Sequence, residues 1–286
     1  MFIVNPVAGR GNGRRLADFI IRSAGGRFDP VIRITERKGH AGDLVYSGLQ
    51  DRIRKFVAVG GDGTVNEVAS ALINTEGILG IIPAGSGNGL ARHFRIPKRV
   101  REALGIAAGG RIRKMDYGTI DGHCFFCVGG IGFDAAVGQV FSQNRRRGVF
   151  AYALTTFSEY FRYRPVRYKL KIDGRKKMRC RAFLISFANA SQYGNNAYIS
   201  PGADTGDGLI DVCILHPFSI LESLGVLYSL FDKKLDNSNL LEIVRCREVL
   251  LKRKNPGYIH YDGEPHKAGK KIKVGIVKHG LKIVVP

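Results

Sequence analysis

A single carboxylate in a turn made mostly of glycine is the most informative chemical feature of the sequence. Asp62 lies among glycines in "VAVGGDGTVNEVASALI", between an apolar run and an amphipathic segment. Backbone N–H groups at the start of a helix attract phosphate, and glycines let the backbone approach it closely. A carboxylate placed there repels phosphate unless a metal ion or a proton intervenes. The turn therefore predicts phosphoryl transfer, in which Mg²⁺ bridges the charges or Asp62 accepts a proton from an attacking hydroxyl.

A second pair of carboxylates, Asp262 and Glu264, occurs late in the chain in "YDGEPH". Alternate residues of a strand share one face, so the two side chains can point together at one metal ion. An acidic turn at the end of a strand, with no metal, is the alternative interpretation.

The first glycine-rich turn, "GRGNGRR", does not match the common phosphate-binding motifs. It is not a P-loop, because no G-K-[ST] follows, and it does not fit G-x-G-x-x-G with a ribose-binding acid about 20 residues on. This turn alone is therefore weak support for a particular ligand.

The first third of the chain repeats one local pattern: an apolar run, a glycine-rich turn, and apolar residues at helical spacing. The pattern starts at "MFIVNP", "FVAV" and "GILGIIP". Continuous apolar runs are typical of strands buried on both faces, and their alternation with helices predicts a parallel sheet covered by helices. Ligands of such sheets bind outside the carboxyl ends of the strands, where the three turns would meet.

After about Asp116 the pattern changes to short or alternating apolar segments. Examples are "HCFFCVGG", "YKLKID", "CRAFLISFANA" and "LIDVCIL". They predict a second, antiparallel β-rich domain. Two segments with helical spacing interrupt it, "FAYALTTFSEYF" and "SILESLGVLYSLF", and we expect both to lie in the core.

The charge balance is strongly positive, with 45 Lys and Arg against 24 Asp and Glu, a formal net charge of +21. Basic residues crowd together between Arg145 and Arg181, where only Glu159 and Asp173 oppose them. Such a field attracts phosphates of a nucleotide, a nucleic acid or an anionic membrane surface. Zinc-finger spacing, an RNP-like aromatic strand and a recognition-helix motif are all missing from the sequence, so a nucleic-acid-binding protein is the least favoured of these.

The sequence predicts a soluble, cytoplasmic protein. No apolar run approaches the roughly 20 residues that cross a bilayer, and "MFIVNPVAGR" lacks the pattern of a signal peptide. Five cysteines, mostly inside apolar runs, suit a reducing compartment. Cys124 and Cys127 form a C-x-x-C, but residues three apart on a strand point to opposite faces, so a zinc or redox site is disfavoured.

Taken in order, the motifs resemble those of the diacylglycerol kinase catalytic-domain family, which includes bacterial lipid kinases and the sphingosine and ceramide kinases. The resemblance runs nearly end to end, through "NPVAGRGNGRR", "TERKGHAGDL", "GGDGTVNEV", "PAGSGNGLARHF", "MDYGTIDG", "GGIGFDAAV", "NASQYGNNAYISPGADTGDGLIDV" and "YDGEP". GGDGT alone also occurs in NAD kinases, whereas the ordered set is specific. The resemblance implies a Rossmann-like α/β nucleotide-binding domain at 1–116, rejoined by 279–286. It implies an antiparallel β-sandwich domain for a lipid substrate at 117–278.

The resemblance also implies ATP with Mg²⁺ as the donor and a membrane lipid as the acceptor. It implies nucleotide contacts for nine residues, namely Asn5, Arg10, Thr35, Gly61, Gly63, Thr64, Glu67, Gly85 and Ser86. Asp62 would be the catalytic base or its close partner, assisted by Asp116 and Glu264. Asp207 and the carbonyl of Leu209 would hold a structural cation, with Asp262 as a further metal ligand.

One departure concerns the acceptor. Several bacterial relatives carry an acid after the asparagine of the third turn, whereas Asn88 here is followed by Gly89. The motif "GSGNG" is more similar to that of the sphingosine kinases, and without the acid the expected set of carboxylates is smaller by one.

The expected function is therefore transfer of the γ-phosphoryl group of ATP to a lipid hydroxyl, with diacylglycerol as the first choice and phosphatidic acid as the product. A sphingoid base or another lipid is the alternative, followed by a soluble alcohol as in NAD kinases. The Arg145 to Arg181 region would hold such an enzyme peripherally on the anionic inner face of the membrane. The alternative to a core position for "SILESLGVLYSLF" is that it lines the groove that admits the acyl chains. The sequence leaves the oligomeric state open, with a dimer as one option.

Overall fold

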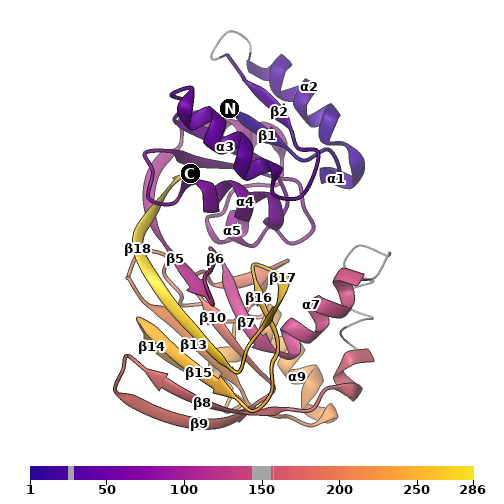
Figure 1. Ribbon diagram of the computed structural model, residues 1–286. Coiled ribbons are helices and arrows are strands. Elements are labelled where there is room, and N and C mark those ends of the chain that lie inside the picture. Colours follow the sequence, from indigo (N-terminus) through magenta and orange to yellow (C-terminus); the bar gives the residue numbers. More distant parts are fainter. Residues whose placement is uncertain (25–28, 144–155, 157) are drawn as a thin grey trace. The chain divides into compact units, whose positions relative to one another are not determined.

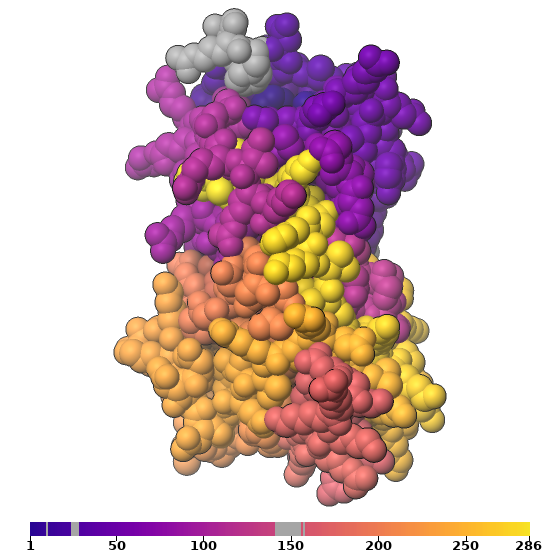
Figure 2. All heavy atoms as spheres, turned by 90° about the vertical axis from the view of Figure 1, so that its left-hand side faces the viewer, coloured from indigo at the N-terminus to yellow at the C-terminus, as the bar shows by residue number. Residues whose placement is uncertain are grey.

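The computed structural model describes residues 1–24, 29–143, 156 and 158–286; the side chains of Arg10, Ala24 and 141–143 are outside this description. The chain folds into two compact units (Figure 1). The first comprises Met1–Met115 and His279–Pro286, and the second comprises Asp116–Lys278. In Figure 2 the last residues, drawn in yellow, lie among the indigo to magenta residues of the first unit.

The sheet of the first unit is parallel, as the alternating pattern predicts. Its strand order is β2–β1–β3–β4, followed by the end of β18, and every pair is parallel. The bounds are Phe2–Val4 (β1), Ile32–Ile34 (β2), Lys55–Gly60 (β3), Ile78–Pro83 (β4) and Lys271–Val285 (β18). The apolar runs of β1, β3 and β4 are buried, because helices cover a parallel sheet on both faces.

The helices of the first unit follow the strands as expected. Their bounds are Ala8–Gly11 (α1), Gly13–Ala24 (α2), His40–Gln50 (α3), Asp62–Leu72 (α4), Gly89–His93 (α5) and Val100–Gly109 (α6). The stripe of α4 at helical spacing is buried, with Val68, Ala69 and Leu72 fully enclosed. Helices α3 and α4 pack against each other, which brings the loops before them together.

The second unit is an antiparallel β-sandwich. One sheet has the order β14–β13–β10–β7–β16–β17, and the other has β18–β15–β8–β9, with β5 beside β18 and β6 beside β5. The bounds are Arg111–Ile120 (β5), His123–Phe125 (β6), Val128–Gly132 (β7), Val166–Ile172 (β8), Lys176–Ala182 (β9), Leu184–Ala188 (β10), Ile210–Leu215 (β13), Leu241–Cys246 (β14), Glu248–Arg253 (β15), Gly257–Tyr261 (β16) and Glu264–Ala268 (β17). The inward residues of both sheets form one apolar core.

The rest of the second unit consists of a small hairpin and helices. The hairpin pairs β11 (Gln192–Gly194) with β12 (Ala197–Tyr198), and helix α7 (Phe133–Gln143) packs on β7, β16 and β17. A short 3-10 helix, Leu235–Asn237, precedes β14. Most of "FAYALTTFSEYF" lies outside the described residues.

Helix α9 (Ile220–Phe231) corrects one expectation. Its start is fixed by a capping box, in which Ser219 and Glu222 exchange side-chain and backbone hydrogen bonds. We expected this segment in the core, but none of its residues is buried. Leu221 and Leu224 are 87% and 75% exposed. The helical spacing was correctly interpreted, but spacing alone does not identify what covers the apolar face.

In the part of the chain that the structure describes, no helix is both long and apolar enough to cross a membrane. Every cysteine lies in this part and has a free thiol. Burial raises the pKa of Cys180 to about 11 and that of Cys246 to about 12. Burial, followed by the charge of Asp262, also raises the pKa of Cys124.

These raised pKa values predict slow thiol chemistry in the folded protein. Only the thiolate reacts with alkylating agents, and a pKa of about 11 in place of 9.0 leaves about 100-fold less thiolate at pH 8. We expect iodoacetamide to modify Cys180 at least about 100-fold more slowly in the native protein than in denaturant. Mass spectrometry of timed samples measures this. Equal rates in both states would show that the thiol is not protected.

Candidate functional site

The three glycine-rich turns follow β1, β3 and β4, which are neighbours in the parallel sheet. Their carboxyl ends therefore lie at one edge. The N–H of Gly9 in the first turn donates to the carbonyl of Ala84 in the third at 2.8 Å, and the N–H of Ala84 donates to Gly60 at 2.8 Å. The structure thus brings the three turns into direct contact.

Asn5 links the first turn to the second. Its side-chain N–H donates to the hydroxyl of Thr64 at 3.1 Å, and its side-chain oxygen accepts from the N–H of Val7 at 3.1 Å. Thr64 is buried in the first turn of α4. Both residues were expected to contact nucleotide, and the structure shows that they also hold the turns in place.

Glycine is required where the second and third turns meet. A Cβ built on Gly85 would lie 2.4 Å from the Cα of Gly61, closer than real Cβ atoms approach other atoms. Asn88, in the left-handed region with φ 54°, closes the third turn by bonding both the N–H and the carbonyl of Gly85. The edge is therefore made of closely packed backbone.

Asp62 is the first residue of α4, and its carboxylate reaches across to the third turn. One oxygen accepts from the N–H of Asn88 at 2.8 Å and the other from that of Gly89 at 2.7 Å. A Cβ on Gly87 would lie 2.6 Å from the carboxylate, so glycine is needed there as well. The side chain is only partly buried. The half-buried carboxylate therefore lies where the second and third turns meet.

Glu67 anchors the loop that carries Thr35. Its carboxylate accepts from the N–H groups of Gly39 at 2.9 Å and Ala41 at 3.3 Å, at the start of α3. Thr35 is nearly buried, and its N–H donates to Val4 at 2.9 Å. Ser86 is exposed in the third turn, whereas the side chain of Arg10 lies outside the described residues.

Asp116 belongs to the second unit and is fully buried. One carboxylate oxygen accepts from the N–H of Gly208 at 2.6 Å, and its backbone N–H donates to Thr205 at 2.6 Å. Asp207 in the same loop is exposed and accepts from the N–H of Leu209 at 2.9 Å. The sequence analysis treated Asp116 as a catalytic residue and the Asp207 loop as a separate cation site. In the structure the two are connected, because Asp116 shapes the loop that is expected to hold the cation.

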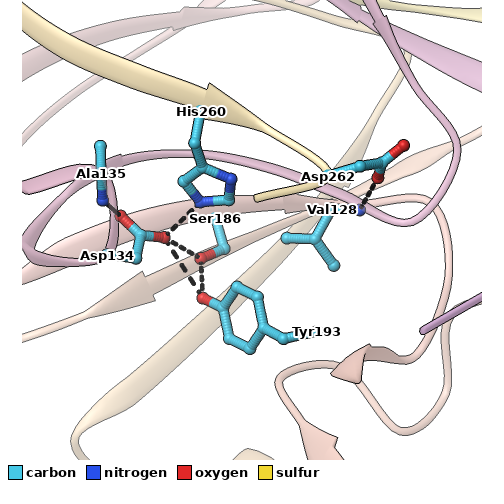
Figure 3. Close-up of polar contacts among 7 residues, drawn as sticks. All are labelled: Val128, Asp134, Ala135, Ser186, Tyr193, His260 and Asp262. Carbon is cyan, nitrogen blue, oxygen red and sulfur yellow. Dashed lines mark hydrogen bonds and ion pairs between the residues drawn. The ribbon is translucent and has the colours of Figure 1, made fainter. Parts of the chain in front are cut away.

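Asp262 and Glu264 do not lie on one strand, as the sequence interpretation assumed. Asp262 lies in the tight turn between β16 and β17, and Glu264 is the first residue of β17. Tyr261 pairs with Glu264 across the turn, and both Asp262 and Gly263 have positive φ. The carboxylate of Asp262 accepts from the N–H groups of Phe126, Cys127 and Val128 at 2.8, 2.8 and 3.1 Å. Figure 3 draws the bond to Val128. Asp262 therefore fixes the entry to β7.

The second unit contains a polar cluster that was not predicted from the sequence (Figure 3). Asp134, in the first turn of α7, lies 2.9 Å from Nε2 of His260 and accepts from Ser186 at 3.2 Å and Tyr193 at 3.4 Å. Ser186 and Tyr193 also bond each other. His260 is 4% exposed, and its Nδ1 has no hydrogen-bond partner within the described residues.

The backbone leaves room for this cluster only because Gly130 has no side chain. A Cβ there would lie 2.3 Å from Nε2 of His260 and 2.5 Å from the carboxylate of Asp134. Asp134, Ser186 and Tyr193 stand in segments quoted above, and His260 immediately precedes "YDGEP". The motifs are widely spaced along the chain, so no spacing rule could join them.

No group of three or more His, Cys, Asp or Glu side chains able to hold a metal occurs among the described residues. Mg²⁺ keeps several waters and binds through one or two carboxylates plus substrate phosphates. A single exposed carboxylate beside backbone carbonyls, as at Asp207 and Leu209, fits a hydrated ion of that kind.

The structure combines a parallel α/β unit that has glycine-rich turns at one sheet edge with an antiparallel β-sandwich unit, and two family profiles match this chain. The profile described as "Diacylglycerol kinase catalytic domain" matches residues 1–120, and that described as "YegS C-terminal NAD kinase beta sandwich-like domain" matches residues 128–284. A diacylglycerol kinase of Mycobacterium tuberculosis (strain ATCC 25618 / H37Rv) is 30% identical over 80% of this chain and 77% of its own. The chain therefore belongs to the diacylglycerol kinase family, a family of lipid kinases.

Other relatives agree with this membership. A YegS-like lipid kinase of Chromohalobacter salexigens is 28% identical over 86% of this chain and 80% of its own. A solved diacylglycerol kinase structure from Bacillus anthracis str. Sterne covers 100% of this chain and 96% of its own, with a TM-score of 0.76 and 18% identity. An NAD kinase of Archaeoglobus fulgidus in complex with ATP has a TM-score of 0.53 and 12% identity, over 99% of this chain and 92% of its own. These two structures show the likeness of the folds.

Proposed function

We propose that the protein transfers the γ-phosphoryl group of ATP to the hydroxyl of diacylglycerol in a membrane, giving phosphatidic acid and ADP. The observation that carries this proposal is the meeting of three glycine turns at one sheet edge, with the carboxylate of Asp62 held between two of them. Family membership supports the class of acceptor.

In this proposal the first unit binds ATP. The backbone at Gly61, Gly63 and Gly85 approaches the phosphates, with Ser86 exposed beside them. Asn5, Thr64 and Glu67 contact nucleotide directly or through the loops that they hold, and Thr35 and Arg10 complete the set. Mg²⁺ would accompany the phosphates and neutralise their charge.

The acceptor hydroxyl attacks the γ-phosphorus, its new O–P bond replaces the bond to ADP, and its proton passes to a carboxylate. Asp62 is the proposed proton acceptor. Each of its oxygens accepts one backbone N–H, which holds the carboxylate at the edge where the turns meet. We propose Glu264 as its partner in catalysis and Asp116 as a positioning residue. The Asp207 loop, together with Asp262, is the proposed place for a structural cation.

The second unit would receive the lipid. The exposed apolar residues of α9 suit contact with acyl chains, and this surface supports an acceptor that stays in a bilayer. We propose that the enzyme works at the cytoplasmic face of the membrane as a peripheral protein.

A second candidate acceptor is a sphingoid base or another lipid alcohol. Its support is Gly89, which stands where several bacterial relatives have an acid and whose N–H is bonded to Asp62. Acyl-chain contacts are generic, so they do not separate the two acceptors.

A panel assay tests the function. The protein is incubated with Mg²⁺, γ-labelled ATP and vesicles of single lipids, or with NAD, and products are extracted into organic solvent and identified by mass. We expect label in the organic phase with diacylglycerol, as phosphatidic acid. Transfer to a sphingoid base alone would support the second candidate. Label confined to water in the NAD sample would contradict both.

A further inference from the structure

The outward face of the second sheet of the second unit is covered by cations. Side chains alternate along a strand, and the inward residues of β8, β9, β15 and β18 form the core. The residues between them point outward, and most are exposed. Nine of these are basic: Arg167, Lys169, Lys171, Lys177, Arg179, Arg181, Lys252, Lys271 and Lys273.

The strand register aligns these cations in rows. Arg179 pairs with Lys169, Lys169 with Lys252, and Lys252 with Lys271, so one row places a cation on each of the four strands. Lys177, Lys171 and Lys273 occupy three of the four positions in the next row, and Arg181 faces Arg167 in a third. Directly opposite side chains on one sheet face have Cβ atoms about 5 Å apart.

Such an arrangement weakens the fold. Like charges in opposite positions are destabilising, and a single acid stands among the paired positions of this face. Glu248 is the acidic residue of this face among the paired positions, and its contact with Lys273, at 3.9 Å, is the one ion pair that the described residues give it. Because the fold retains this repulsion between cations, the dense and regular positive charge of the face indicates a function.

We propose that this face docks the protein on an anionic lipid bilayer. A flat array of Lys and Arg matches a plane of negative headgroups, and each cation near the surface contributes attraction. The face carries no aromatic residue among its paired positions, and stacking platforms for single-stranded nucleic acid require them. The proposal rests on the proposed function in one respect: a lipid kinase works on a membrane, so we take a membrane as the polyanionic partner of this face.

This surface overlaps with the basic segment between Arg145 and Arg181 that the sequence singled out, which supplies six of its nine cations. Residues 144–155 and 157 of that segment lie outside the described residues. Lys252, Lys271 and Lys273 come from distant parts of the chain and join the face through strand pairing. Docking is therefore a property of the folded sheet.

The test variant neutralises the four-strand row with R179Q, K169Q, K252Q and K271Q. Its control removes the same charge from exposed positions of the first unit with R22Q, R33Q, K98Q and R101Q. Sedimentation with vesicles of equal parts phosphatidylglycerol and phosphatidylcholine measures binding. We expect the row variant to lose about 10²- to 10³-fold in apparent affinity and the control less than about 10-fold. Neither the row variant nor the control variant should bind vesicles of pure phosphatidylcholine.

Two further measurements make the result decisive. Removing the repulsion should raise the Tm of the row variant by about 2 to 4 °C, so weaker binding cannot come from unfolding. Kinase activity on diacylglycerol in neutral detergent micelles should stay within about twofold of the wild type, because docking is not needed there. Vesicle binding without any kinase activity would overturn the proposed function but leave this inference intact.

Equal losses in the two variants would overturn the inference, because the effect would then be one of net charge. Tighter binding of both proteins to duplex DNA than to the anionic vesicles would also overturn it, and would identify a nucleic acid as the partner.

Discussion

Replacing Asp62 with asparagine is expected to lower kcat for lipid phosphorylation by about 10²- to 10⁴-fold while leaving the Kd for ATP within a few fold. The substitution removes the proton acceptor and keeps the size of the side chain. It also turns an NH₂ group toward a backbone N–H of Asn88 or Gly89, so one loop contact is lost. Steady-state kinetics, together with calorimetric titration of an ATP analogue, separate the two effects.

Glu67→Gln is the matched control. Its carboxylate also accepts two backbone N–H groups, and it lies in the same helix as Asp62. We expect this variant to lose stability and ATP affinity but to keep kcat within about tenfold. If Asp62→Asn retained wild-type turnover, or lost it only in proportion to unfolding, the role of Asp62 would be structural.

Gly85→Ala is expected to weaken ATP binding by about 100-fold or more and to destabilise the protein by roughly 2 to 3 kcal/mol. The added Cβ would meet the Cα of Gly61 at 2.4 Å, so the second and third turns must separate. The nearest atom is backbone, which cannot move aside as a flexible side chain would. Chemical denaturation and calorimetric titration of an ATP analogue measure the two losses.

Gly105→Ala is the control for this variant. Gly105 lies inside α6 of the same unit, and a Cβ there meets nothing within 4 Å. Alanine in a helix interior should raise the stability by up to about 1 kcal/mol and leave ATP binding unchanged. Normal ATP affinity in Gly85→Ala would contradict the proposed phosphate site.

The sequence was sufficient for the fold class because local patterns decide it. Continuous apolar runs such as "FVAV" predict strands buried on both faces, and the stripe through Val68, Ala69 and Leu72 predicts the helix that covers them. The antiparallel character of the second unit followed from its short, alternating segments. These features need only neighbouring residues, which a sequence displays directly.

The interactions of the acidic residues were not predictable in the same way. Asp62, Asp116 and Asp262 each accept N–H groups from backbone far along the chain, and every residue offers such a group. No residue type therefore marks the partner. The bond between Asp134 and His260 likewise depends on how α7 packs on β16.

The surfaces were predicted least well, because exposure depends on the packing of the whole unit. The apolar spacing of α9 is compatible with a buried helix, yet Leu221 is 87% exposed. The alternating charges of "RYKLK" and "KKMRCR" are visible in the sequence. Their alignment with Lys252 and Lys271 requires the strand register.

The most direct test of the account is amide hydrogen exchange of the full protein with and without Mg²⁺ and a nonhydrolysable ATP analogue at saturation. We predict slower exchange in peptides covering residues 5–13, 60–67 and 84–89, because these backbone groups would hold the phosphates. Unchanged exchange in all three turns, with the analogue shown by calorimetry to be bound, would contradict the account.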